Sequence, residues 1–143
     1  MTMGIPPEIL RHTAYQYPGR LTEPMGSAEK RSPICGSRVI VDVNLNNEGR
    51  VSDIGMRVNA CAFGQAAATV LAQSLANRTP AELSSLRDNI ANWIAGNGDV
   101  PDWPGIWDLR PERLNSVRKA SVQLAFQAAA DAAEAAATAK AAR

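Results

Sequence analysis

The sequence predicts an α+β protein, in which a small antiparallel sheet of two or three strands packs against four or five helices. Residues 38–58 alternate between apolar and polar side chains and are interrupted by the turn-forming stretch NNEGR, which is typical of a β-hairpin. From residue 60 onward, small and apolar residues recur with helical spacing in three further segments. Because an isolated hairpin is only marginally stable in water, we expect the sheet to lean on these helices.

The N-terminal half contains one short helix and the strands. Pro6, Pro7 and Glu8 open an expected helix over residues 6–16, since proline and an acidic residue favour a first helical turn. Residues 17–33 hold several prolines and glycines and are expected to be connecting chain, with one edge strand before Pro33. The hairpin strands follow at 38–45 and 52–58, joined by a turn that uses Gly49.

The C-terminal half is expected to be helical. One helix is predicted from Cys61 to about Ala76. Another is predicted from Pro80 to a stop at Gly96 or Gly98, with Thr79 as its N-cap and Glu82 completing a capping box. A turn-rich connector follows, which we expect Trp103 and Trp107 to pin to the body. The last helix is predicted from Pro111. Its alanine-rich end, residues 127–143, has little to bury and is expected to project from a single scaffold-like domain, residues 1–143, with its core at about 6–126.

Composition excludes several classes of function. The 15 Lys plus Arg balance 14 Asp plus Glu, which removes the electrostatic argument for nucleic acid or an anionic membrane surface. No apolar run approaches the roughly 20 residues that a membrane-spanning helix needs. The N-terminal residues lack the pattern of a secretory signal, so we expect a cytoplasmic protein whose two cysteines are thiols.

The two cysteines are predicted to lie at one end of the hairpin. Cys35 precedes the first hairpin strand and Cys61 follows the second, and antiparallel strands bring those two points to the same edge of a sheet. Gly36 allows a tight turn beside Cys35. Cys61 begins a helix, whose N-terminal dipole favours a thiolate. The alternative is that both residues are small buried hydrophobic side chains, as free cysteines often are.

These segments resemble the NifU/IscU/SufU-type iron–sulfur cluster assembly scaffold family. The similarity is carried by SPICGS at residues 32–37, by Cys61 at the start of a helix rich in small residues, by YPGRL at 17–21 and by RKASVQLAF at 118–126. It extends from about Ile9 to Phe126. The resemblance implies the fold of that family's N-terminal domain and places Cys35 and Cys61 at its first and second ligand positions.

Two ligand positions depart from the family pattern. By the same resemblance, Ser37 replaces an aspartate and Ser121 replaces a third cysteine, and both are at most weak or vestigial ligands because hydroxyls bind iron or zinc poorly compared with thiolates. The function this implies is a non-enzymatic scaffold or carrier that binds iron or a [2Fe–2S] cluster through Cys35 and Cys61, shared between two chains of a homodimer. Zinc is an alternative metal, and a small thiol such as glutathione is an alternative source of the missing ligands.

The resemblance also implies partners: a cysteine desulfurase, other iron–sulfur assembly proteins and apo-protein acceptors. Two other functions stay open, a sulfur carrier without a stable cluster and a non-metal adaptor that keeps the fold as a protein-binding module. His12 is the only histidine, so one chain cannot build a site from two histidines. The cationic residues at the start of the last helix are interpreted as a solvated face, namely Arg110, Arg113, Arg118 and Lys119.

Overall fold

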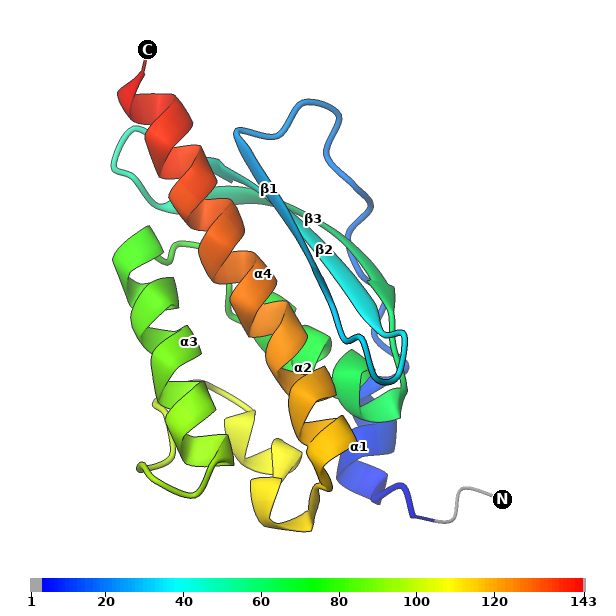
Figure 1. Ribbon diagram of the computed structural model, residues 1–143. Helices are drawn as coiled ribbons and strands as arrows, with labels where there is room; N and C mark the ends of the chain where they lie inside the picture. The colour runs from blue at the N-terminus through cyan, green and yellow to red at the C-terminus, as the bar shows by residue number, and fades with distance from the viewer. Residues whose placement is uncertain (1–3, 143) are drawn as a thin grey trace.

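The computed structural model describes residues 4–142 and shows the α+β fold that the sequence predicts (Figure 1). Three antiparallel strands form one sheet in the order β1-β2-β3, with β1 at Gly26–Arg31, β2 at Arg38–Leu45 and β3 at Val51–Asn59. The expected edge strand before Pro33 is therefore present as β1. The hairpin register pairs Arg38 with Asn59, so the first residue of β2 lies beside the last residue of β3.

Four α-helices and two short 3₁₀ helices complete the described chain. Their bounds are α1 Pro7–His12, α2 Ala62–Gln73, α3 Pro80–Ile94, η1 Ile106–Leu109, η2 Pro111–Arg113 and α4 Ser116–Ala141. The predicted Thr79 N-cap is confirmed, because its side chain accepts a hydrogen bond from the Glu82 N–H at 3.1 Å, and the Glu82 carboxylate accepts one from the Thr79 hydroxyl at 3.3 Å. The last helix begins later than predicted. Pro111 opens only a 3₁₀ turn, and Asn115 caps α4 by accepting a hydrogen bond from the Arg118 N–H.

The expected projecting alanine-rich helix is wrong. Helix α4 lies along the sheet and contacts β1, β2, α2 and α3 (Figure 1). Gly26 explains this packing, because a Cβ there would overlap the Ala132 carbonyl oxygen and the Ala136 amide nitrogen. Small side chains on both surfaces thus allow the helix backbone to lie directly on the strand. Six alanines beyond Phe126 are fully buried as a result: Ala128, Ala129, Ala130, Ala132, Ala133 and Ala136.

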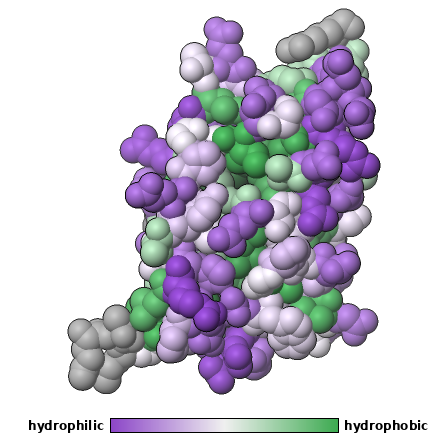
Figure 2. Space-filling view, turned by 180° about the vertical axis from the view of Figure 1, so that it is seen from behind, coloured by the Kyte–Doolittle hydropathy of each residue, from purple (hydrophilic) through white to green (hydrophobic). Residues whose placement is uncertain are grey.

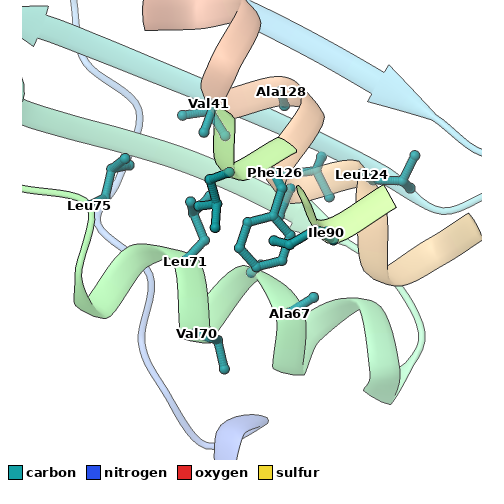
Figure 3. Close-up of a cluster of buried hydrophobic side chains, with 14 of the residues drawn as sticks. Val41, Ala67, Val70, Leu71, Leu75, Ile90, Leu124, Phe126 and Ala128 are labelled. Atoms are coloured by element: carbon teal, nitrogen blue, oxygen red, sulfur yellow. The ribbon is translucent and has the colours of Figure 1, made fainter. Parts of the chain in front are cut away.

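The main core lies between the sheet and the helices. Val41 of β2, Leu71 of α2, Ile90 of α3 and Phe126 of α4 are all buried in this cluster (Figure 3). The alternation of β2 turns Val39, Val41 and Val43 toward it, as the sequence predicts. On the side shown in Figure 2, hydrophilic side chains cover most of the surface and apolar groups form separate patches. The helices thus bury one face of the sheet and fix the position of its ends.

The connector between α3 and α4 is anchored by one tryptophan. Trp103 is buried and its indole N–H donates to the Val70 carbonyl oxygen at 2.9 Å. The prediction that Trp107 also pins the connector inside the body is wrong, because 65% of that residue is exposed. Its ring lies edge-on to Trp93, with the two centroids 6.3 Å apart. Within the described residues 4–142, no helix combines the length and apolar character needed to cross a membrane.

A buried carboxylate holds residues 18–25 against the other face of the sheet. Asp42 is fully buried and accepts hydrogen bonds from the Arg20 guanidinium, the Ser27 hydroxyl and the Leu21 N–H. Burial alone raises the pKa of Asp42, but these donors, with Arg20 foremost, more than offset it and hold the pKa below its ordinary value of 3.8. The carboxylate therefore stabilises the fold at neutral pH, and this contribution disappears as the pH falls through that lowered pKa.

Replacing Asp42 by Asn should lower the free energy of unfolding at pH 7 by about 2 kcal/mol, because charged hydrogen bonds to a buried acceptor are lost. Chemical denaturation of both proteins measures this difference. The difference should shrink as the pH is lowered below 3.8, where the wild-type carboxylate also becomes protonated. Asp53→Asn is the control, since Asp53 is exposed on β3. Equal losses in the two variants would contradict the role assigned to Asp42.

Candidate metal centre

Cys35 and Cys61 lie at the same end of the sheet, as predicted. Cys35 sits in the loop that joins β1 to β2, and this loop is closed by a hydrogen bond from the Ser32 N–H to the Ser37 carbonyl oxygen at 2.9 Å. Cys61 is the N-cap residue of α2, immediately after β3. In Figure 1 this loop and the start of α2 lie together at the lower end of the sheet. Both cysteines are exposed, so the alternative of two buried hydrophobic side chains is wrong.

Two buried serines connect the cysteines. The Cys35 thiol donates to the Ser37 hydroxyl, with 3.1 Å between sulfur and oxygen. Ser121 of α4 donates to Ser37 at 3.4 Å, and its oxygen is 3.5 Å from the Cys61 sulfur. Ser37 is 4% exposed and Ser121 is 1% exposed. The four residues singled out in the sequence therefore form one continuous cluster, with thiols at the surface and hydroxyls beneath them.

The pKa of the Cys35 thiol is lowered from its ordinary value of 9.0 because the side chains of Ser32 and Ser37 and the Ser37 backbone can hydrogen-bond to the sulfur once it is a thiolate. Ser32 is buried, with only 3% of the residue exposed. Among the described residues, its hydroxyl oxygen has no hydrogen-bond partner. Its proton is therefore free to be donated to the sulfur once Cys35 ionises. Ser32 was not among the residues that the sequence indicated, since serine in a turn carries no distinct signal.

Replacing Ser32 by Ala should raise the pKa of the Cys35 thiol and slow its alkylation at neutral pH. The rate of reaction with iodoacetamide, followed against pH in a Cys61→Ala background, measures that pKa directly. Ser37→Ala should act in the same direction. Ser52→Ala, at an exposed position on β3, is the control. An unchanged rate profile in both Ser32→Ala and Ser37→Ala would contradict the assigned cause.

Gly64 and Arg118 complete the surroundings of the cluster, and neither was predicted to lie there. A Cβ at Gly64 would lie 2.6 Å from the Ser121 hydroxyl oxygen, so the glycine allows α2 and α4 to approach there. The Arg118 guanidinium lies over the Phe63 ring, 4.3 Å from its centroid, near the first turn of α2. It is thus a partly buried cation stacked on the first turn of α2, and not part of a solvated face. Arg110 and Arg113 instead pair with Glu8.

The donor set of one chain does not suit a metal ion or cluster by itself. Among residues 4–142, no three His, Cys, Asp or Glu side chains gather where they could hold a metal ion. His12 does not join the thiols, because its ring is hydrogen-bonded to Asp108 at 2.9 Å. The cluster therefore offers two exposed thiols and two buried hydroxyls, whereas tetrahedral iron or zinc sites use four thiolate or imidazole ligands in most cases.

Solved structures share this fold and this arrangement of elements. A crystal structure of a NifU-like protein (N-terminal) from Brucella abortus matches with a TM-score of 0.83 and 32% identity, over 94% of this chain and 96% of that one. A putative iron–sulfur cluster assembly scaffold protein for the SUF system from Fervidobacterium islandicum AW-1 matches with a TM-score of 0.81 and 17% identity, over 92% and 97%. A hypothetical protein matches with a TM-score of 0.70 and 19% identity, over 89% and 94%.

The fold and the thiol-bearing end of the sheet define a NifU-like N-terminal domain. The chain belongs to the NifU/IscU/SufU-type family. No protein-family model and no curated protein matches the chain.

Proposed function

We propose that this protein is a non-enzymatic iron–sulfur cluster assembly scaffold or carrier, and that residues 1–143 form one scaffold-like domain. The observation that carries the proposal is the pair of exposed thiols, Cys35 and Cys61, linked through Ser37 and Ser121 at one end of the sheet. The similar protein from Fervidobacterium islandicum is described as a putative iron–sulfur cluster assembly scaffold. That role requires ligands at the surface, where a cluster can be received and passed on.

The ligand count favours a site shared between two chains. A [2Fe–2S] cluster is held by four thiolates, and one chain supplies two. Two chains that meet at their Cys35 and Cys61 ends would supply four. Cluster binding would then bring two chains together, so the homodimer would depend on the metal. The same donor set would hold a single iron or zinc ion between two chains.

The residues around the thiols suit an anionic cargo. Hydrogen bonds from Ser32 and Ser37 favour the Cys35 thiolate, which is the form that binds iron. Arg118 holds a positive charge over Phe63, two residues after Cys61, and would favour a cluster that carries net negative charge. Sulfur would be supplied by a cysteine desulfurase, and the cluster would pass to apo-protein acceptors in the cytoplasm. In this role the chain holds and transfers its cargo without turning over a small substrate.

Anaerobic reconstitution with ferrous iron and sulfide tests the proposal. We expect visible absorption and iron and sulfide contents that correspond to about one [2Fe–2S] cluster per two chains. Cys35→Ala and Cys61→Ala should each lose the cluster, while Ser116→Ala, on the exposed first turn of α4, should keep it. Equal cluster contents in the wild type and the three variants would contradict the assignment of Cys35 and Cys61 as ligands. No loading of the wild type would favour the adaptor role.

A further inference from the structure

A cavity of about 540 Å³ lies at the Cys35 end of the sheet, on the face opposite the helices. It is lined by Arg31, Ser32, Pro33, Gly36, Arg38 and Asn59. The strand register places Arg31 of β1 opposite Arg38 of β2, and Arg38 opposite Asn59 of β3, so three polar side chains form one row across the sheet. Its volume falls within the roughly 300–1,000 Å³ typical of small-molecule sites.

The row has an excess of positive charge. Glu29 pairs with both guanidiniums, through the Arg31 Nε at 3.1 Å and the Arg38 Nε at 3.3 Å. Two cations thus share one carboxylate, and each guanidinium has further N–H groups for a second acceptor. The Asn59 side chain adds a neutral donor at the end of the row. A carboxylate fits such a pair, because its two oxygens can accept parallel N–H hydrogen bonds from a guanidinium.

Two residues that line the cavity lie close to the cysteines in the sequence. Gly36 directly follows Cys35, and Asn59 lies two residues before Cys61. Gly36 carries no side chain, and a Cβ built there would meet nothing within 4 Å. The loop therefore leaves open space at Gly36, the residue next to Cys35, at the edge of the cavity. A tripeptide-sized molecule spans about 10 Å when extended.

We propose that this cavity binds the carboxylate of a low-molecular-weight thiol of the glutathione or cysteine class, whose sulfur occupies one ligand position of a cluster on a single chain until a second chain supplies its own thiolates. The proposal rests on the proposed function for the role of that sulfur, and on the cavity alone for binding of the carboxylate. Ser37 and Ser121 leave two ligand positions without a thiolate. A thiol anchored by Arg31 and Arg38 would supply one from outside the chain, losing its proton to water as it binds iron.

Titration of the cluster-free protein tests the carboxylate site without any metal. S-methylglutathione, which keeps both carboxylates but cannot ligate iron through a thiolate, should bind in isothermal titration calorimetry. Arg38→Gln should weaken that binding about tenfold. Arg57→Gln is the matched control, because Arg57 is exposed on β3 opposite Ile40 and does not line the cavity. Glu29→Gln should bind more tightly, since it frees both guanidiniums.

The site would be overturned if S-methylglutathione did not bind, or if Arg38→Gln and Arg57→Gln weakened its binding equally. It would also be overturned if sulfate bound as tightly as S-methylglutathione. Parallel titrations with S-methylcysteine identify the source: glutathione is the ligand if only the tripeptide binds, and cysteine if both bind equally. Circular dichroism of each variant verifies that it is folded.

Reconstitution with different thiols tests the role of the sulfur and separates the two proposals. Glutathione or cysteine should raise the yield of cluster per chain severalfold over cysteamine, a thiol without a carboxylate, and Arg38→Gln should remove this advantage. Equal yields with cysteamine would overturn the ligand role of the bound thiol. If S-methylglutathione binds the cluster-free protein but no cluster forms with any thiol, the scaffold function fails while the carboxylate site stands.

Discussion

Replacing Ser37 by Asp and Ser121 by Cys together should create a metal site within a single chain. The four side chains at positions 35, 37, 61 and 121 are already linked by contacts of 3.1, 3.4 and 3.5 Å, so no change of backbone is needed to bring them together. Three thiolates and one carboxylate form a donor set that suits tetrahedral zinc. We expect the double variant to bind one Zn²⁺ per chain at least about a thousandfold more tightly than the wild type, because structural zinc sites gain about 10–16 kcal/mol.

Competition with a chromophoric zinc chelator measures this affinity. Ser116→Cys is the matched control, since it adds a thiol to the exposed first turn of α4 away from the cluster. Size-exclusion chromatography should show the zinc-loaded double variant as a monomer. Zinc affinity no higher than that of Ser116→Cys would mean that the four side chains do not converge as described.

Gly26→Ala should lower the free energy of unfolding by more than about 3 kcal/mol. The added methyl group would overlap backbone atoms of Ala132 and Ala136, and backbone cannot move aside as a flexible side chain can. Helix α4 would have to lift from β1, which would expose the alanines that its packing buries. Urea denaturation followed by circular dichroism measures the loss.

Gly19→Ala is the control for this substitution. Gly19 is exposed and a Cβ there would meet nothing within 4 Å, so its replacement should change stability by less than about 0.5 kcal/mol. If Gly26→Ala were as stable as Gly19→Ala, the close approach of α4 to β1 would be contradicted.

The parts of the fold that follow local rules could be predicted from the sequence. Apolar alternation gave β2 and β3, and Thr79 with Glu82 marked the start of α3 because both capping partners lie within one turn. The meeting of Cys35 and Cys61 also followed, since hairpin pairing alone brings their neighbours, Arg38 and Asn59, opposite each other. The position of Ser121 beneath them came from the family resemblance.

Features that depend on distant pairs could not be predicted in this way. The alanine-rich half of α4 was expected to project because alanine has a small surface, but small residues also permit close contact with Gly26, about a hundred residues away in sequence. Arg118 was interpreted as a solvated cation because its stacking on Phe63 depends on how α2 and α4 pack. The burial of Asp42 likewise depends on residues 18–25 crossing the sheet.

The central claim is that two chains share one cluster through Cys35 and Cys61. Native mass spectrometry of the anaerobically reconstituted protein tests it most directly. We expect a species of two chains with two iron and two sulfide ions, which reverts to single chains when a chelator removes the iron. A single chain that carries a complete cluster without any added thiol, or a dimer that persists without iron, would contradict the claim.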